Sequence, residues 1–185
     1  MKRRSPTEPA NPGEANIPEE IRRRTFQRAI KLLAAKPRSI ADLRESLLKG
    51  RGARPSVVED VIARLREYGY LDDERFAFGY AALRVKQKPI GRLRLKRDLM
   101  VKKVDQEVAE EALDLVFGET SEEELIDRAI EKRVRLRGRP QTPDAARKLF
   151  DHLMRQGFPF ELVSDKMRAL AKLDSEEPAE SLDYS

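Results

Sequence analysis

The chain has 185 residues, of which 38% are charged and 39% are apolar, and its net charge at neutral pH is +5. It has no cysteine and a single histidine, His152, which excludes disulfides, zinc-thiolate sites, thiol nucleophiles and multi-histidine metal sites. The apolar runs are far shorter than the roughly 18 residues of a membrane span, and the first residues are basic and then proline-rich, so we expect a cytoplasmic protein without a membrane partner.

The charges are strongly segregated along the chain. Residues 84–103 carry nine basic side chains against Asp98 alone, whereas residues 105–124 carry nine acidic side chains and no basic one. Residues 174–185 carry five acidic side chains and no basic one. This segregation favours a polyanion or an acidic protein surface as the partner, and a solvated charged surface is the alternative interpretation.

Apolar residues recur at spacings of three and four from residue 19 to residue 173, which predicts an all-α protein. Residues 1–18, rich in proline, and residues 174–185, which are acidic, lack this period and are predicted to be disordered tails. The predicted helices cover residues 19–36, 39–49, 56–68, 72–87, 90–102, 105–117, 121–138, 142–156 and 159–173.

Residue types at the helix boundaries support these bounds. Ser39, Asp72, Asp105 and Thr142 are predicted N-caps, and Ser56 with Glu59 and Ser121 with Glu124 have the spacing of capping boxes. The glycines predicted to end helices in a left-handed conformation are Gly50, Gly69, Gly118 and Gly157.

The nine predicted helices form three sets of three. Leu43 and Leu47 lie 52 residues before Leu95 and Leu99, and these lie 54 residues before Leu149 and Leu153. We therefore predict three tandem three-helix repeats, at residues 19–71, 72–118 and 119–173, in an elongated, curved, solenoid-like arrangement.

Three-helix units of this kind also suggest a helix-turn-helix-type DNA-binding transcriptional regulator, which is the alternative function. The third helix of the first unit carries Glu59 and Asp60, and that of the second unit carries Asp105, Glu107, Glu110 and Glu111. Carboxylates on a recognition helix repel DNA, so base reading by these helices is disfavoured.

Basic side chains are the candidate contacts to a partner. They lie at the end of the fourth predicted helix, along the fifth, and at the end of the seventh: Arg84, Lys86, Lys88, Arg92, Arg94, Lys96, Arg97, Lys132, Arg133, Arg135, Arg137 and Arg139. Such stripes can neutralise phosphates without reading sequence. The alternative is that cations near helix C-termini only complement the helix dipole.

Residues 71–80, Leu-Asp-Asp-Glu-Arg-Phe-Ala-Phe-Gly-Tyr, form the densest local motif. We interpret Asp72 as a helix cap and Asp73 as favourable to the helix dipole, in preference to metal ligands. Phe76 and Tyr80 are four residues apart and are expected to pack rather than to stack on bases. The chain shows no phosphate-loop, dinucleotide or nucleophile motif, so we expect no catalytic residue, metal or cofactor.

The chain resembles RecX-family regulators of the RecA recombinase. The most specific part of this resemblance is the hinge motif of Leu71, Asp72, Asp73, Phe76, Ala77 and Tyr80, and Gly91 and the pair Gly157 and Phe158 also match. Two positions depart from the family pattern. Lys103 stands where members often have glycine, and Gly50-Arg51-Gly52 lengthens the first turn by about one residue.

The resemblance implies a non-enzymatic protein that binds RecA and the RecA–DNA filament. It implies that the protein mainly inhibits filament extension, strand exchange, ATP hydrolysis and coprotease activity, and so regulates recombination, DNA repair and the SOS response. The implied partners are the RecA filament and DNA, bound within the filament or non-specifically, and we expect a monomer.

Overall fold

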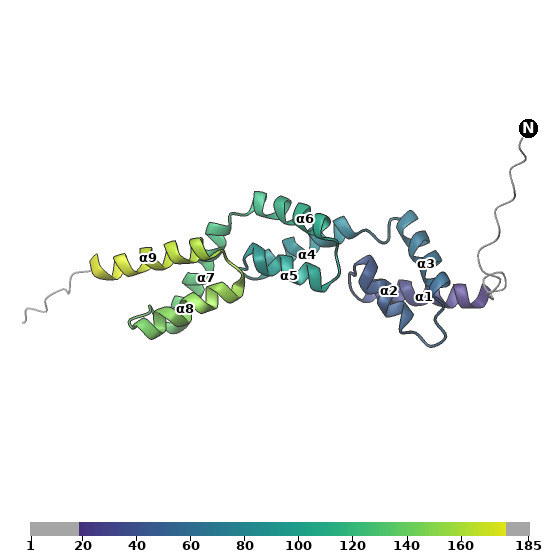
Figure 1. The fold of residues 1–185 in the computed structure, drawn as a ribbon, viewed down its shortest axis with the longest axis horizontal. Coiled ribbons are helices and arrows are strands. Elements are labelled where there is room, and N and C mark those ends of the chain that lie inside the picture. The colour runs from purple at the N-terminus through teal and green to yellow at the C-terminus, as the bar shows by residue number, and fades with distance from the viewer. Residues whose placement is uncertain (1–18, 177–185) are drawn as a thin grey trace, which may run out of the picture. The chain divides into compact units, whose positions relative to one another are not determined.

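The computed structural model describes residues 19–176. Within this range the chain forms nine α-helices and no strand, which confirms the predicted all-α class (Figure 1). The helices are α1 (Glu19–Ala35), α2 (Ile40–Leu48), α3 (Pro55–Glu67), α4 (Asp73–Gln87), α5 (Arg92–Val101), α6 (Gln106–Glu119), α7 (Glu122–Arg137), α8 (Pro143–Gln156) and α9 (Phe160–Glu176).

The ends of the chain fall partly outside this range. The predicted tail at residues 1–18 and residues 177–185 of the predicted acidic tail lie outside the described residues. The remaining residues of that acidic segment belong to α9, which runs to Glu176 instead of ending at residue 173. No helix in the described part of the chain is long and apolar enough to cross a membrane.

The predicted N-caps are mostly confirmed. The side chains of Ser39, Asp105, Ser121 and Thr142 each accept a hydrogen bond from a backbone N–H in the first turn of the following helix, and the Asp72 carboxylate accepts one from the N–H of Arg75.

The prediction of a capping box at Ser56 is wrong. Arg54 is the N-cap of α3 and Pro55 occupies the first helical position, so Ser56 lies inside the first turn. Proline suits that position because its fixed φ is helical and it has no N–H to satisfy. Glu59 instead pairs with Arg44 of α2, at 2.7 Å.

The predicted left-handed glycines are confirmed at two of four positions. Gly69 and Gly157 have positive φ, whereas Gly118 lies within α6 and Gly52, not Gly50, takes the positive φ in the first long turn. In the described residues one non-glycine has a positive φ, Lys103, at 59°. At this position the resemblance described above leads us to expect glycine.

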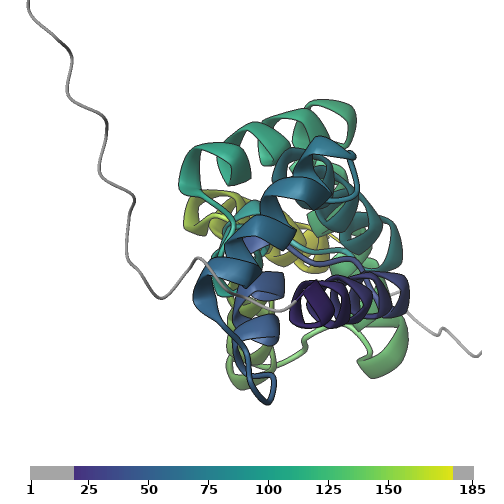
Figure 2. The ribbon, with the colours of Figure 1, turned by 90° about the vertical axis from the view of Figure 1, so that its right-hand side faces the viewer.

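The chain divides into two compact units between Phe76 and Ala77. In the first unit α1 packs on both α2 and α3, and α2 packs on α3, as Figure 2 shows with α1 in purple. Ala29, Leu43, Leu47, Val57 and Leu65 form the centre of its core and are at most 1% exposed.

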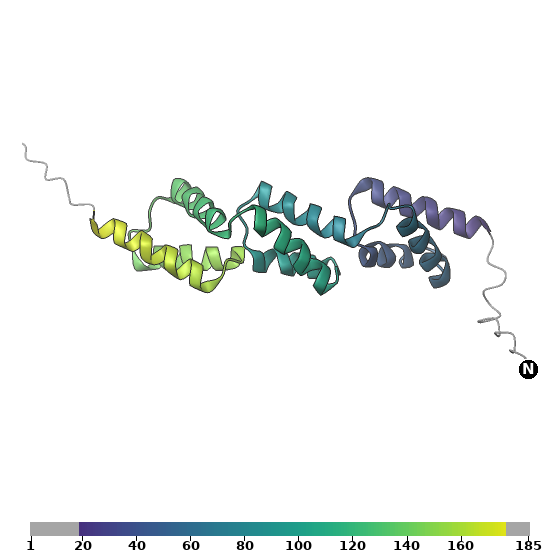
Figure 3. The same cartoon turned by 90° about the horizontal axis from the view of Figure 1, so that it is seen from above.

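The second unit contains the two later helix sets. α5 packs on α6, and α7, α8 and α9 pack on one another (Figure 3). The repeating leucines Leu95, Leu99, Leu149 and Leu153 are at most 3% exposed, like Leu43 and Leu47 in the first unit. The predicted equivalence of the middle helices is therefore confirmed in burial, while the repeat boundaries and their curved arrangement stay predictions.

Candidate interaction surface

The first half of the hinge motif makes its contacts within the first unit. Leu71 is buried in the core at 3% exposure, and Asp72 caps α4. Asp73, the first residue of α4, accepts a hydrogen bond at 2.8 Å from the backbone N–H of Ile40, the first residue of α2. Burial raises the pKa of the Asp73 carboxyl above its ordinary value. The cap predicted at Asp72 is confirmed. Asp73 lies in the first turn of α4, as expected, and its hydrogen bond to the first N–H of α2 was not predicted from sequence.

The second half of the motif belongs to the second unit. Ala77 is fully buried, and the Tyr80 hydroxyl donates to the Asp98 carboxylate at 3.4 Å. Arg84 donates to the same carboxylate at 3.4 Å, and the Lys102 ammonium lies 4.9 Å from the centre of the Tyr80 ring. Asp98, the acidic residue of the segment 84–103, is therefore engaged with two of its neighbours.

Two of the candidate basic residues on α5 are neutralised by α6. Arg92 contacts Glu110 at 2.8 Å and Asp114 at 2.6 Å, and Lys96 forms an ion pair with Glu110. Hydrogen bonds from Lys96 and Arg92 hold the pKa of Glu110 below its ordinary value. The basic segment and the acidic segment recognised in the sequence thus face each other at this place.

The N-terminus of α5 is joined to the third helix set through backbone atoms. The N–H groups of Gly91 and Leu93 donate to the carbonyls of Gln156 and Gly157 at 3.0 and 3.1 Å. A Cβ atom on Gly91 would lie 2.3 Å from the Gly157 carbonyl oxygen, so glycine permits this approach.

Two side chains complete this junction. The Arg92 N–H donates at 2.8 Å to Glu122, the first residue of α7, and the Arg94 guanidinium donates to the Arg155 carbonyl at 3.2 Å. Burial raises the pKa of the Glu122 carboxyl. Sequence reasoning missed the role of Glu122, because the acceptor lies 30 residues from its donor in the chain.

Several other candidates line two neighbouring hollows of the second unit. Lys88, Lys132 and Arg133 line a hollow of about 230 Å³, together with Pro89, Ala129, Leu136, His152 and Gln156. We call this the basic hollow. A larger hollow of about 590 Å³ shares Pro89 and Lys132 with it and adds Arg128, Glu131, Val134 and Arg135. Among the described residues that line the basic hollow, no side chain is acidic.

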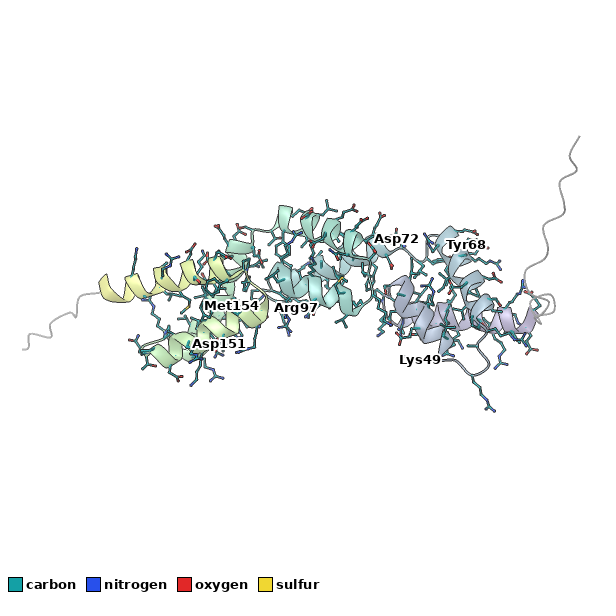
Figure 4. All side chains as sticks on the ribbon, in the orientation of Figure 1. Lys49, Tyr68, Asp72, Arg97, Asp151 and Met154 are labelled. Atoms are coloured by element: carbon teal, nitrogen blue, oxygen red, sulfur yellow. The ribbon has the colours of Figure 1, made fainter. Side chains whose placement is uncertain are left out.

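His152 is half-buried in this hollow, in agreement with the boundary position expected from its helix. The labelled residues Asp151 and Met154 mark its part of α8 in Figure 4. Burial lowers the pKa of His152, and the positive charges of Arg133 and Arg155 lower it further. The position of His152 beside the candidate cations could not be predicted from sequence, because α8 and α7 are brought together only by tertiary packing. Arg128 lies four residues before Lys132 on α7, so helical spacing could have added it to the candidates.

The remaining candidates lie away from the basic hollow. Arg135 and Arg137 occupy the last turn of α7, where cations complement the helix dipole. Lys86 and Arg139 are exposed. Arg97, labelled in Figure 4, is exposed on α5 and donates to the Leu93 carbonyl at 3.3 Å.

Comparison with known proteins places the chain in a family. The family model described as RecX, second three-helix domain, matches residues 72–113. Regulatory protein RecX of Pelodictyon phaeoclathratiforme is 32% identical over 152 residues, which cover 81% of this chain and 92% of that protein. This chain belongs to the RecX family. The family assignment made from the hinge motif is therefore confirmed.

Other RecX proteins are similar over less of their length. Regulatory protein RecX of Treponema pallidum is 43% identical over 110 residues, covering 60% of this chain and 66% of that protein. The chain spans just 53% of the RecX protein of Bacillus subtilis. The crystal structure of RecX from Lactobacillus salivarius has a TM-score of 0.71 at 16% identity and covers 83% of this chain and 99% of that chain, so the two share a fold.

Proposed function

We propose that this protein binds a RecA recombinase and the RecA–DNA filament and mainly inhibits filament extension. Strand exchange, ATP hydrolysis and coprotease activity all depend on the filament and are reduced with it, and recombination, DNA repair and the SOS response are regulated as a result. The name of its relatives, regulatory protein RecX, supports a regulatory role. In this proposal the protein acts in the cytoplasm as a monomer, without a cofactor and without catalysing a reaction.

One observation carries the choice of surface. Among the candidate cations of the second unit, Arg92 and Lys96 are paired with α6, whereas Lys88, Lys132 and Arg133 gather in a hollow without an acidic side chain among its described residues. The exposed candidates, such as Lys86 and Arg97, lie away from that hollow. A charge already paired within the protein gives up that pair when it meets a partner, while a charge in an acid-free hollow gives up nothing comparable. We therefore assign the filament contact to Lys88, Lys132 and Arg133.

The direct test is ATP hydrolysis by RecA in the presence of single-stranded DNA, at near-physiological salt. The protein is titrated into preformed filaments and, separately, into filaments during assembly. Inhibition at much less than one molecule per RecA indicates a block to filament growth, and inhibition only near saturation indicates coating. No inhibition by the folded protein in either order contradicts the proposed function.

Charge reversal tests the assigned surface. We expect Lys132→Glu with Arg133→Glu to weaken inhibition at least about tenfold, a change of about 1.4 kcal/mol in binding. Arg147→Glu is the matched control, since Arg147 is an exposed cation of α8 and lies five residues, or about 140° around the helix, from His152. Equal inhibition by the two variants removes the basic hollow from the mechanism.

A helix-turn-helix transcriptional regulator makes a different prediction, a preferred duplex sequence. Selection from random duplexes distinguishes the two functions, because a basic protein binds any DNA at low salt and simple binding does not separate them. An enriched motif together with no effect on RecA replaces the proposed function with this one.

A further inference from the structure

We infer that the basic hollow binds a phosphodiester group of a nucleic-acid strand, with Lys88, Lys132 and Arg133 as the neutralising side chains and His152 at its wall. This inference rests on the proposed function and deepens it, because it names the component of the filament that the surface meets. The hollow is formed by three segments of the second unit, namely the linker after α4, the second half of α7, and α8.

The position of the linker is fixed by the backbone. Ile90 is 2% exposed, and the N–H of Gly91 donates to the Gln156 carbonyl at 3.0 Å. These contacts hold Lys88 and Pro89 beside the C-terminal end of α8, opposite α7. Because the anchoring groups are a buried side chain and a backbone hydrogen bond, the cations meet at this place whether or not a ligand is present.

The helix dipole does not account for these cations. The carbonyls at the end of α8 already accept hydrogen bonds from α5, through Gly91, Leu93 and Arg94. Lys132 and Arg133 precede the last turn of α7, in contrast to Arg135 and Arg137. Their positive charges therefore do not complement the C-terminal end of either helix. They lie around the hollow instead.

A nucleic-acid strand fits this arrangement better than an acidic protein surface. Protein interfaces are depleted of lysine at their buried centre, whereas nucleic-acid interfaces are strongly positive. The adjoining hollow shares Lys132 and adds Arg128 and Arg135 against Glu131 alone. Cations thus follow one another across both hollows, which suits a polymer with regularly spaced negative charges. Pro89 and Leu136 offer apolar contact to the sugars that lie between successive phosphates.

His152 provides a specific readout because it is the one histidine of the sequence, so its imidazole signals in NMR spectra need no assignment. The charged groups around it are Lys88 from the linker, Lys132 and Arg133 from α7, and Arg155 from α8. Burial and this positive charge lower its pKa in the free protein. A phosphate among these groups offsets part of this positive charge and so raises the pKa of His152.

The experiment is an NMR pH titration of His152 in the full chain, alone and with a thymidine oligonucleotide at near-physiological salt. We expect the oligonucleotide to raise the pKa of His152 by about half a unit or more. In Lys132→Gln with Arg133→Gln this rise is lost, and in Arg147→Gln it is retained. An unchanged pKa with bound oligonucleotide overturns the inference.

Oligonucleotide affinity gives a second, independent measurement. Removing two phosphate contacts lowers the slope of log affinity against log salt concentration by about 1.4 for a single strand. We expect this change in the double variant and not in Arg147→Gln. An unchanged slope in the double variant counts against phosphate contact at the hollow, even if its affinity falls.

Two further ligands separate the possible sources of the anion. If inorganic phosphate at low millimolar concentration raises the pKa of His152 and the oligonucleotide does not, the hollow is a site for free phosphate. This result overturns the assignment to nucleic acid. Poly-glutamate that raises the pKa as strongly as the oligonucleotide identifies an acidic protein ligand and also overturns it.

The inference and the proposed function fail separately. A rise in the pKa of His152 with DNA, but no inhibition of RecA, keeps the phosphate site and contradicts the function. Inhibition of RecA without a rise in that pKa keeps the function and removes the phosphate site.

Discussion

The middle helices α2 and α5 are equivalent in the repeat, yet their N-termini are satisfied in different ways. α2 begins after Ser39, whose side chain accepts from the N–H of Asp42. α5 begins after Gly91, which has no side chain, and the N–H groups of Gly91 and Leu93 donate to carbonyls at the end of α8. The first solution is local to one turn, while the second depends on packing between two helix sets.

In both helices the first N–H donates to a carboxylate at the start of a later helix. The first N–H of α2, from Ile40, donates to Asp73 at the start of α4, and the first N–H of α5, from Arg92, donates to Glu122 at the start of α7. Both distances are 2.8 Å. At the start of α8 the same position holds Pro143, which has no N–H and needs no acceptor.

This comparison shows that the two carboxylates occupy corresponding positions. A carboxylate at the start of one helix set satisfies the middle helix of the set before it, so each junction combines a helix cap with a contact between sets. The junction at α5 adds direct backbone contact, which requires glycine at two positions. We therefore expect the two junctions to respond differently to substitution.

Glycine substitution gives the largest expected effect. A Cβ atom on Gly157 would lie 2.3 Å from the backbone nitrogen of Arg94, and its φ is +86°. We expect Gly157→Ala to lower the free energy of unfolding by about 3 kcal/mol, from overlap and left-handed strain together. Gly52→Ala, with φ +71° and no atom within 4 Å, is the control and costs about 1 kcal/mol. Urea unfolding measures both, and equal losses contradict tight packing at the α5 junction.

Removal of the shared carboxylate gives the next effect. Asp73→Ala leaves the N–H of Ile40 without its acceptor, and we expect it to cost about 1–2 kcal/mol of stability. Asp73→Asn retains a side-chain carbonyl and is expected to cost less than half as much. Glu122→Ala and Glu122→Gln are the corresponding two substitutions at the α5 junction, where Glu122 accepts from the N–H of Arg92. Hydrogen exchange at the Ile40 and Arg92 amides reports each junction directly, and unchanged exchange in the alanine variants argues against this device.

Substitution of Lys103 tests whether its positive φ lowers the stability of the protein. Its φ of 59° is unfavourable for a residue with a side chain, so we expect Lys103→Gly to raise stability by about 1 kcal/mol. Lys103→Ala removes the same charge but keeps the strain, and it separates the two contributions. A gain of equal size in both variants assigns the effect to charge and not to the backbone.

The dependence of stability on pH distinguishes the half-buried carboxyl of Asp73 from the paired carboxyl of Glu110. The pKa of Asp73 is raised on folding, so its contribution is greatest at low pH and declines as the pH rises above the ordinary value of 3.8. The pKa of Glu110 is lowered, so its contribution is present above the ordinary value of 4.5 and is lost as the pH falls.

Free energies of unfolding, measured from pH 3 to pH 7, test these opposite dependences on pH. Relative to the unsubstituted protein, Asp73→Asn should gain stability as the pH rises, and Glu110→Gln should lose it. Difference curves that are flat for both variants contradict the assigned directions.

Much of this protein could be predicted from local sequence. Leucine spacing predicted the helices and the equivalence of Leu43, Leu95 and Leu149, because the period of an α-helix determines which residues share a face. The cap at Ser39 and the left-handed Gly157 were predicted for the same reason, since both depend on a few neighbouring residues. The capping box at Ser56 failed because the adjacent Pro55 is a stronger signal for a first helical position.

Only the tertiary structure decided which cations are paired within the protein. In the sequence Arg92 and Lys132 belong to similar basic stripes, yet Arg92 meets Glu110 and Asp114 of α6, whereas Lys132 lines the basic hollow. Local sequence determines the charge a side chain carries and the helix face it occupies. Its partners come from helices tens of residues away, and the packing of the cores places those helices.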